Sequence, residues 1–490
     1  MHRIIPILIL ASLFLAPDPS AAQPYQQLRG VIHLDSTVSG GEMTPEELIR
    51  YLVQNDLEVA IFTDQVTTRV RYGFFPARWL TERISGWIGG KLFHRESSVL
   101  THGPTLYLDE LLDLDMRYDE IIVLPGVEVY PFYYWKGNLP NLSMVNGHKH
   151  LLAIGMESPD DYTQLPTVSE GFFQGYSLET LLSLWPLALI FLGFKCRRKS
   201  REIVHPQLLI IPSWIFFGIG ALFLIHNFPY QFGKYDQYHG DQGVKPYQEF
   251  IDYVIGRGGL VFWAHPEASK ADVYKIGPIQ VTLQTKAPYE DLLHTQNYTG
   301  FAAFYEGMKY IIPPGGIWDQ ILNRYCLGKR SAPIWAIAEG DVEGDQFSPQ
   351  LSQTVFLVEE RSRQAILKSL REGRIYAMAG PVAQHLRLTD FTVSSSIDTA
   401  RMGTTLEVAI GHPIHVDALL ECEESALGNE LRAELIYNGE VVQTYKGKGL
   451  LKITYTDSVK SDQRRHYFRL DVRAPKQTRL LSNPIFFTSS

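Results

Sequence analysis

Short apolar runs rich in β-branched residues recur along the first three quarters of the chain. They lie at 59–63, 121–129, 150–155, 259–265, 300–306, 333–341 and 354–360. Their length and composition are typical of buried strands in parallel sheets. Most are separated by segments able to form a helix, for example 246–258. This repeated alternation predicts an α/β fold built on a parallel sheet or barrel.

The stretch 29–65 illustrates the pattern, because it predicts a strand, a loop, a helix and a second strand. Thr44 is an N-cap candidate, Pro45 suits the first helical position and Glu47 stands three residues after the cap. Apolar residues then recur at helical spacing as far as Val53. We therefore expect a βαβ unit here.

The pattern changes at about residue 386, where short strands of alternating apolar and polar residues replace the succession of strands and helices. An Asn-Gly pair at 438–439 predicts a tight hairpin turn between two of them. A chain of 490 residues favours two or three folded units. We expect a barrel domain over 23–385 and a C-terminal β-sandwich over 386–490.

The N-terminus has a basic tip, a short apolar run and small residues ending at Ala22. This pattern predicts a secretory signal peptide over 1–22 that is cleaved near Ala22. The alternative is an uncleaved membrane anchor.

A second apolar region, 178–227, interrupts the predicted barrel. It contains apolar runs at 181–194 and 208–225, separated by a turn with five Lys or Arg residues between 195 and 201. Such a pair predicts a two-helix transmembrane hairpin whose basic turn stays in the cytoplasm. The lipid bilayer is then a partner of segment 181–225, and the catalytic domain lies on the exported (periplasmic or extracellular) side of the cytoplasmic membrane. The alternative is a buried hairpin in the core of a soluble protein.

Charge and cysteine content exclude some functions. The net charge is −8, and no basic stripe exists outside the turn of the apolar pair, so no nucleic-acid partner is expected. The three cysteines lack C-x-x-C spacing, which argues against a disulfide framework and a thiolate metal site.

Potential metal ligands stand near the ends of the predicted strands. In parallel barrels, working residues lie at the C-terminal ends of strands. The candidates are His33, Asp35, Asp64, Glu128, His150, His265, Asp341 and Glu343. Clustered carboxylates repel one another unless a cation lies among them. Oxygen and imidazole donors suit Mn, Zn or Fe.

Several of these residues stand in ordered motifs. The segments "HLDSTVSGG", "FTDQ", "PGVEV", "HLLAIG", "GGLVFWAHPE" and "EGDVEG" follow one another along the chain. In this order they resemble the polymerase-and-histidinol-phosphatase (PHP) superfamily. The pieces "REGRIYAMAGP", "AELIYNGEVV" and "SNPIFF" resemble its exported carbaryl-hydrolase-like (CehA/McbA-type) branch, which carries a β-sandwich. The resemblance implies a distorted (β/α)7 barrel with metals at its mouth.

The resemblance also implies a ligand set with two divalent metal ions per chain. One ion would be held by His33, Asp35, Glu128 and Asp341, and the other by Glu128, His150 and His265, with Glu128 bridging. Asp35, Gln65 and Glu343 each replace a histidine of the family pattern. Asp35 can still coordinate a metal, whereas Gln65 is a poor ligand and a third metal is not expected.

These implications lead to the hypothesis of a metal-dependent hydrolase, most directly a phosphoesterase that uses a metal-bridging hydroxide. Asp64 would orient the water or complete a metal shell, Gln65 would hydrogen-bond a ligand or water, and Glu343 would coordinate metal or protonate the leaving group. The substrate would be a small ester or phosphoester. Alternatives are a carboxyl or carbamate ester hydrolase, a degenerate barrel that only binds, and a scaffold that presents the sandwich.

Three further features stay open at this stage. His148 is a candidate neighbour of the metal site. The aromatic run 130–135 either walls the substrate pocket or lies at a membrane interface, where Tyr and Trp concentrate. Arg69 and Arg71 either grip an anionic substrate or point into solvent.

Overall fold

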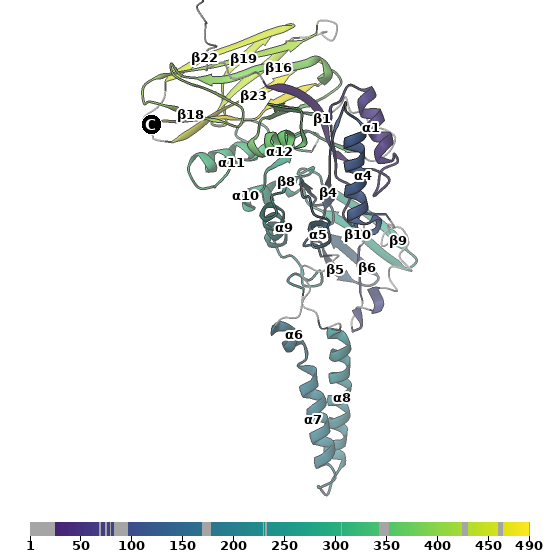
Figure 1. Cartoon of the computed structure of the whole chain (residues 1–490). Helices are drawn as coiled ribbons and strands as arrows, with labels where there is room; N and C mark the ends of the chain where they lie inside the picture. The colour runs from purple at the N-terminus through teal and green to yellow at the C-terminus, as the bar shows by residue number, and fades with distance from the viewer. Residues whose placement is uncertain are drawn as a thin grey trace, which may run out of the picture.

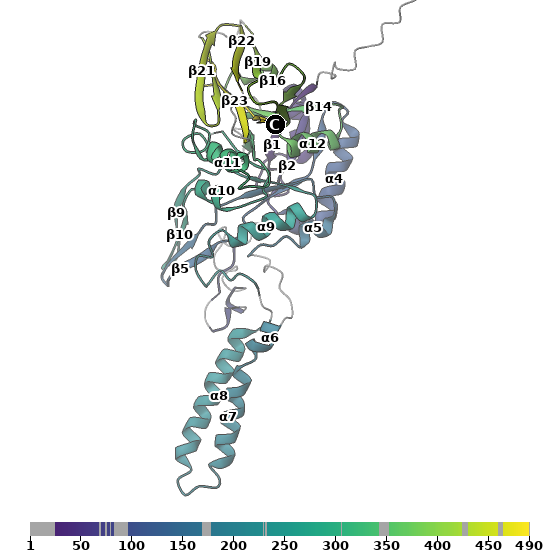
Figure 2. The same ribbon diagram turned by 90° about the vertical axis from the view of Figure 1, so that its left-hand side faces the viewer.

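The structure, a computed structural model, shows a mixed α/β body from which two long helices project (Figure 1, Figure 2). It describes residues 25–67, 70–73, 76–78, 80–82, 97–168, 178–228, 230, 233–304, 306–342, 352–423, 430–458 and 464–489. The predicted signal peptide and two candidate residues, Arg69 and Glu343, lie outside these ranges.

The predicted βαβ unit is confirmed. It consists of β1 (Gln26–Leu34), α1 (Pro45–Gln54) and β2 (Val59–Phe62), and β1 pairs with β2 in parallel. The capping box is complete, because the Thr44 N–H donates to Glu47 Oε2 at 2.8 Å and the Glu47 N–H donates to Thr44 Oγ1 at 3.3 Å. The helix buries its apolar face, including Leu48 and Leu52, against the sheet.

Strand pairing in the N-terminal half runs in a ring. One run of parallel neighbours is β13 (Glu339–Val342), β1, β2 and β3 (Ile122–Leu124). A second sheet has the order β12 (Trp335–Ile337), β11 (Gly300–Ala302), β8 (Leu260–Trp263), β7 (Leu151–Ile154) and β4 (Gly126–Val129). Pro125 alone separates β3 from β4, and Ala338 alone separates β12 from β13. The chain therefore links the two sheets at both edges.

The expectation of parallel strands throughout is wrong for β7, which is antiparallel to both β4 and β8. A parallel neighbour needs a crossover connection, usually a helix. The segment between β4 and β7 holds two short strands instead, and it returns the chain antiparallel. The strands β14 (Ser352–Val358) and β15 (Ile375–Ala379) are also antiparallel, on the side of β1 where the sheet continues into the C-terminal half.

An extra four-stranded sheet, which the sequence pattern did not predict, projects from the ring. Its order is β5 (Tyr134–Asn138), β6 (Asn141–Val145), β10 (Ile279–Thr285) and β9 (Lys270–Ile276). Helices pack around the ring, and the apolar core lies between them and the sheets. They are α3 (Val99–His102), α4 (Pro104–Arg117), α5 (Pro159–Thr163), α9 (Lys245–Gly256), α10 (Asp291–His294), α11 (Ile317–Cys326) and α12 (Arg363–Glu372).

The C-terminal part consists of two packed layers of strands around a second core. One layer contains β16 (Leu386–Ser394), β17 (Thr399–Arg401), β19 (Pro413–Cys422) and β22 (Leu450–Ser458). The other contains β18 (Thr405–Val408), β20 (Leu431–Tyr437), β21 (Glu440–Gly447), β23 (Arg465–Arg473), β24 (Arg479–Ser482) and β25 (Ile485–Ser489). The predicted Asn-Gly turn is confirmed between β20 and β21, with φ of 49° at Asn438 and 93° at Gly439.

The two halves share a continuous sheet, because β15 pairs with β24. A buried ion pair adds to this connection: the Arg469 guanidinium on β23 donates to both carboxylate oxygens of Asp319 on α11, at 2.8 and 2.6 Å. The Tyr467 hydroxyl donates to the same carboxylate at 2.8 Å. Asn483, which directly follows β24, hydrogen-bonds the backbone of Ala336 in β12. The sandwich therefore supports the ring directly.

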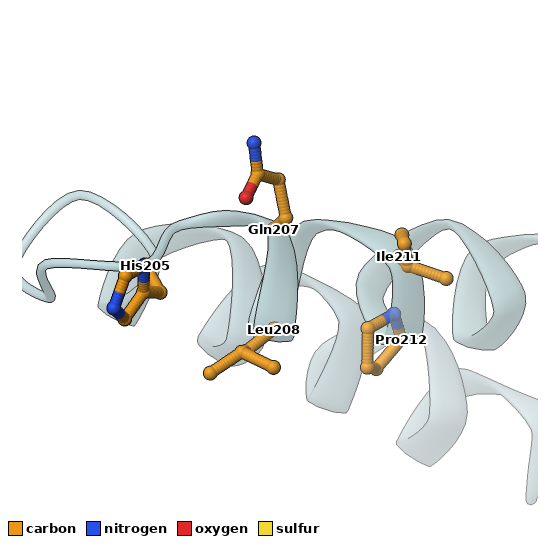
Figure 3. Close-up of a pocket in the computed structure, with 5 residues that line it drawn as sticks. All are labelled: His205, Gln207, Leu208, Ile211 and Pro212. Atoms are coloured by element: carbon orange, nitrogen blue, oxygen red, sulfur yellow. The ribbon is translucent and has the colours of Figure 1, made fainter.

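The projecting hairpin consists of α6 (Leu178–Ser183), α7 (Pro186–Lys199) and α8 (Gln207–Asn227). Two of its stretches, Thr180–Lys199 and Gln207–Asn227, are long and apolar enough to cross a membrane, with mean hydropathy of 1.4 and 2.4. Only 17% and 11% of these windows are buried, which does not fit a core hairpin. Small residues let the helices approach closely: a Cβ on Gly220 would lie 2.7 Å from Ile190. A shallow hollow lies beside the turn, lined by residues from His205 to Pro212 (Figure 3).

Candidate metal centre

The backbone departs from regular strand geometry at three of the predicted ligands. His33 falls at a bulge in β1, where the register with β2 and β13 shifts between Ile32 and Leu34. Its φ is 72°, and His265 and Asp341 also have positive φ, at 27° and 44°. Non-glycine residues rarely adopt this conformation, and such strain concentrates at functional sites. The bulge, and not simple strand alternation, therefore aims His33 and Asp35 at the same place.

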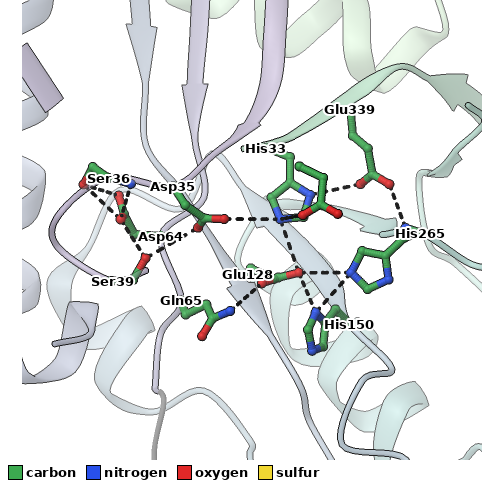
Figure 4. Close-up of polar contacts among 11 residues, drawn as sticks. His33, Asp35, Ser36, Ser39, Asp64, Gln65, Glu128, His150, His265 and Glu339 are labelled. Carbon is green, nitrogen blue, oxygen red and sulfur yellow. Dashed lines mark hydrogen bonds and ion pairs between the residues drawn. The ribbon is translucent and has the colours of Figure 1, made fainter. Parts of the chain in front are cut away.

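Glu128 on β4 lies at the centre of the group (Figure 4). Its Oε1 is 2.6 Å from Nδ1 of His150, 3.3 Å from Nε2 of His265 and 3.2 Å from Nε2 of His33. Three imidazole rings thus surround one carboxylate oxygen: His33 lies in β1, His150 directly precedes β7 and His265 follows β8. Glu128 therefore lies within reach of the histidines of both ligand groups.

The six predicted ligands converge in two neighbouring groups, which the 3.2 Å contact between Glu128 and His33 joins. Glu128, His150 and His265 form one group of ligand atoms within 4.8 Å of one another, and His33, Asp35 and Asp341 form the other. In the second group, Nε2 of His33 lies 4.0 Å from Asp35 and 3.9 Å from Asp341. Five of the six side chains are buried, whereas that of Asp341 is 50% exposed. The centre therefore opens to solvent beside Asp341.

Buried polar atoms at the centre lack hydrogen-bond partners. Oδ2 of Asp35 and Nε2 of His33 are both inaccessible to solvent and without a hydrogen bond of good geometry, although Nε2 lies in ion-pair range of Glu128 at 3.2 Å. A buried polar atom without a partner costs roughly 1–3 kcal/mol. Coordination to a divalent cation would satisfy both atoms, so the donor set fits a metal ion.

The carboxylates of the centre titrate far from their ordinary range. Burial raises the pKa of Asp35 well above its usual value, and the carboxylates of Glu128 and Asp64 add to this effect against the opposing charge of His33. Burial would also raise the pKa of Glu128, but the charges of His150 and His33 outweigh it and hold that pKa well below its usual value.

Two histidines of the centre, His33 and His265, have raised pKa values. Burial would lower the pKa of His265, but its hydrogen bond to Glu128 and the nearby charge of Glu339 raise that pKa to about 9. Burial likewise opposes protonation of His33, whose pKa is nevertheless raised well above its usual value by Glu128. Protons on these rings therefore provide the positive charge that Glu128 needs, and a metal ion would replace them.

Glu339 on β13 is a member of the centre that sequence reasoning missed. Its Oε2 lies 3.0 Å from Nδ1 of His33, and its Oε1 accepts the backbone N–H of His265 at 2.8 Å. It is 3% exposed. A carboxylate on Nδ1 leaves Nε2 of His33 available as a ligand. Strand alternation could have revealed Glu339, because it stands two residues before Asp341 and so shares its face.

Asp64 follows β2, but its carboxylate does not join the two ligand groups. Oδ1 accepts the backbone N–H of Ser36 at 2.8 Å and the hydroxyl of Ser39 at 2.8 Å, and both oxygens accept the Ser36 hydroxyl. Burial raises the pKa of Asp64 against these hydrogen bonds. These hydrogen bonds tie Asp64 to the loop that carries Asp35, and its expected role in orienting water or completing a metal shell stays a prediction.

Gln65 also contacts the centre indirectly. Its side-chain amide donates to Oε2 of Glu128 at 3.1 Å, while the backbones of the two residues form a parallel bridge. The amide thus fixes the oxygen of Glu128 that does not face the histidines. In this structure its hydrogen bond goes to a protein carboxylate, whereas the sequence predicted one to a ligand or water.

His150 reaches the centre from the opposite end of its strand to that expected. It precedes β7, so it lies at the N-terminal end of that strand. The reversed direction of β7 brings this end to the same rim as the C-terminal ends of β1 and β8.

His148 stacks against the centre. Its ring lies 4.7 Å from that of His265 and 4.8 Å from that of His150. Burial, with the charges of those two rings, lowers the pKa of His148 to about 2. His148 is therefore a neutral neighbour of the cluster at physiological pH.

The aromatic run 130–135 belongs to the body and not to the hairpin. Phe132 and Tyr133 are fully buried, and the ring of Tyr130 lies 5.9 Å from that of His150. Their burial beside the metal centre favours the pocket-wall alternative over the membrane-interface one. The Arg71 backbone is tied to this run, because its carbonyl accepts the indole N–H of Trp135 at 2.9 Å.

Comparisons with known proteins give limited guidance. No family model matches the sequence, and no curated protein matches it. One similar solved structure is a two-domain protein from Bacteroides vulgatus containing a predicted PHP-like metal-dependent phosphoesterase, with 11% identity, 95% of each chain covered and a TM-score of 0.35. Another is a candidate metal-dependent phosphoesterase from Bifidobacterium adolescentis, with 13% identity, a TM-score of 0.28, and 70% of this chain and 95% of that chain covered. At these TM-scores neither likeness supports an argument about fold or function.

Proposed function

We propose that this protein is a membrane-anchored, extracytoplasmic metal-dependent hydrolase, most directly a phosphoesterase. The observation that carries the proposal is the position of Glu128 between two groups of potential ligands, each of which it can complete. The ring has seven strand positions, counted with β3–β4 and β12–β13 as one each, which supports the distorted barrel that the family resemblance implies.

The residues present fit two divalent ions such as Mn, Zn or Fe. His33, Asp35, Glu128 and Asp341 would hold one, and Glu128, His150 and His265 the other. Bound ions would supply Lewis-acid activation of water and charge neutralisation at phosphorus. The mixture of imidazole and carboxylate donors, without thiolates, suits these metals.

The protein's own groups would organise this chemistry. Glu339 orients the ring of His33, and Gln65 orients the carboxylate of Glu128. Asp64 fixes the loop that bears Asp35 through Ser36 and Ser39. The exposed side chain of Asp341 marks the side from which a substrate enters.

Membrane anchoring rests on the hairpin. The two helices expose large apolar side chains to solvent along their length, among them Leu181, Phe191, Phe194, Leu208, Ile211 and Trp214. A soluble surface rarely exposes such a continuous apolar area. The basic residues gather at the tip, farthest from the body, which supports a cytoplasmic tip and an exported body.

The test uses the full-length chain purified in detergent, stripped of metal and reloaded with Mn²⁺, Zn²⁺ or Fe²⁺. A panel of aryl phosphomonoesters, aryl phosphodiesters, aryl carboxyl esters and aryl carbamates is then assayed. We expect metal-dependent release of the aryl alcohol from at least one phosphoester, and loss of at least 100-fold of this activity in His265→Ala.

The matched control is His412→Ala, which changes an exposed sandwich histidine and should retain activity. Turnover of only the carboxyl esters or carbamates would replace the phosphoesterase proposal by the ester-hydrolase alternative. No turnover with fully loaded protein would favour a binding module.

A further inference from the structure

The rim of the metal centre is formed by the strand ends that carry His33, Glu128, His150 and His265, and two of its segments lead into structure on the hairpin side of the body. The chain after Glu128 forms β5 and β6, and the chain after His265 forms β9 and β10. The hairpin itself is inserted between β7 and β8, the strands next to His150 and His265. Both views show the sheet of β5, β6, β9 and β10 on the side of the ring from which the helices project (Figure 1, Figure 2). The rim of the metal centre therefore faces the base of the hairpin.

A direct contact joins the hairpin base to the segment that follows Gln65. Nδ1 of His226, at the end of α8, donates to the backbone carbonyl of Pro76 at 3.1 Å. Two residues further on, the Arg78 guanidinium lies 4.0 Å above the ring of Tyr238. The Tyr238 hydroxyl accepts the Gly73 N–H at 2.6 Å. These contacts fix the hairpin base against the rim.

From this point a series of ring contacts leads to the metal centre. Successive ring centroids are separated by 6.0 Å for Tyr238 and Tyr72, 4.8 Å for Tyr72 and Trp135, 6.2 Å for Trp135 and Tyr133, 6.3 Å for Tyr133 and Tyr130, and 5.9 Å for Tyr130 and His150. The first two rings are partly exposed and the others are buried. Packed aromatic side chains therefore connect the membrane end of the body to the ligand His150.

The hairpin is the right length to hold the body close to a bilayer. The 21 residues of α8 extend about 32 Å at 1.5 Å per residue, which matches the apolar thickness of a membrane. Trp185 and Tyr230 stand at the body end, where interfacial aromatic residues would lie. With the helices spanning the membrane, the β5–β6–β10–β9 sheet and the rim behind it lie at the outer surface.

We propose that the substrate is a long-chain phosphoester held in the outer leaflet of the bilayer. This inference rests on the proposed function, and it adds that the substrate reaches the rim from the membrane with its chain still in the lipid. In the hydrolysis, the oxygen of one water forms a bond to phosphorus while one phosphorus–oxygen ester bond breaks. One proton of that water passes to the leaving oxygen, which departs as an alcohol, and the phosphoryl product keeps the new hydroxyl or its conjugate base.

The test compares two diesters that differ only in their chain: methyl 4-nitrophenyl phosphate and hexadecyl 4-nitrophenyl phosphate. Full-length, metal-loaded protein is reconstituted in phosphatidylcholine vesicles that carry the hexadecyl diester, and the methyl diester is supplied in solution. At equal total concentration we expect hexadecyl turnover at least 10-fold faster. Equal or slower turnover of the hexadecyl diester, with the methyl diester hydrolysed, would overturn this inference and leave the proposed function intact. Hydrolysis of neither would count against the proposed function itself.

A structural measurement tests the orientation without catalysis. A fluorophore on Val273→Cys in β9 or on Ile397→Cys in the sandwich transfers energy to an acceptor on lipid headgroups. Both positions are exposed, at 56% and 91%. The Cys196→Ser protein without an added cysteine is labelled in the same way, and its signal is subtracted as background. We expect clearly greater transfer from position 273. Equal transfer, or greater transfer from position 397, would mean that the rim does not face the membrane.

Discussion

Glu339 holds His33 by its Nδ1 at 3.0 Å and, through its other oxygen, the backbone N–H of His265 at 2.8 Å. One buried carboxylate thus connects the first ligand group to the second. The hydrogen-bond partner of the second ring nitrogen orients a metal-binding histidine and tunes its metal affinity. Glu339 should therefore influence metal affinity without itself binding the metal.

Glu339→Gln keeps the shape of this side chain but removes its charge. We expect metal affinity to fall roughly 10- to 100-fold, because Nδ1 of His33 loses its anionic acceptor. Titration of the metal-free protein with Mn²⁺, followed by calorimetry, measures the change. Glu440→Gln, at the exposed first residue of β21 in the sandwich, is the control and should leave affinity unchanged. An unaltered Mn²⁺ affinity in Glu339→Gln would refute the positioning role.

Metal binding should release protons near neutral pH. The pKa of His265 is about 9 in the metal-free centre, and that of His33 is also raised, so both rings carry a proton at pH 7. A ligating imidazole must be neutral, and each ion therefore displaces protons. Calorimetric titration with Mn²⁺ in two buffers of different ionisation enthalpy measures this number. Equal apparent enthalpies in the two buffers would contradict the predicted protonation.

The stability of the metal-free protein should fall as pH rises above neutrality. For a histidine whose folded pKa is raised, the contribution is fully present below the unfolded value of about 6.5 and is lost as pH rises through the folded value. For His265 that window runs from about 6.5 to about 9. The raised pKa of Asp35 acts in the same direction, since its buried charge is unfavourable. We expect a lower Tm at pH 9.5 than at pH 6.5, and a smaller difference with Mn²⁺ bound. A higher Tm at pH 9.5 without metal would be inconsistent with this electrostatic account.

The buried ion pair of Asp319 and Arg469 should stabilise the contact between the two halves of the chain. Asp319→Ala leaves the guanidinium of Arg469 buried without its carboxylate, which costs about 3–5 kcal/mol. Urea unfolding of the detergent-solubilised chain measures the loss. The double variant Asp319→Leu with Arg469→Met should recover a large part of it, because it removes both charges. Recovery is the discriminating result: a double variant no more stable than the single one would mean that the ion pair itself is not the cause.

Much of the metal centre could be predicted from sequence, because strand ends and residue types are local information. The strand ends gave eight candidates, and the family resemblance reduced them to six ligands. The structure brings these six together: His33, Asp35, Glu128, His150, His265 and Asp341. The selection of His150 succeeded although its strand runs in the opposite direction. A strand pattern does not encode direction, so this error was unavoidable from residues alone.

Other features depend on tertiary contacts that no local pattern carries. Asp64 accepts hydrogen bonds from Ser36 and Ser39, which only the loop geometry brings to its carboxylate. The continuous pairing of β15 with β24 crosses the boundary at residue 386, where the sequence texture changes. The four-stranded sheet joins two insertions about 130 residues apart in the chain, and β6 meets β10 in parallel only in the folded protein.

The central claim is that Glu128 completes two metal sites at once, and its most direct test is a metal count. Purified full-length protein is loaded with Mn²⁺, dialysed and analysed by elemental mass spectrometry beside Glu128→Gln and the control His412→Ala. The account predicts two equivalents per chain in the wild type and the control, and fewer than one in Glu128→Gln. Two retained equivalents in Glu128→Gln, or no metal in the wild type, would contradict it.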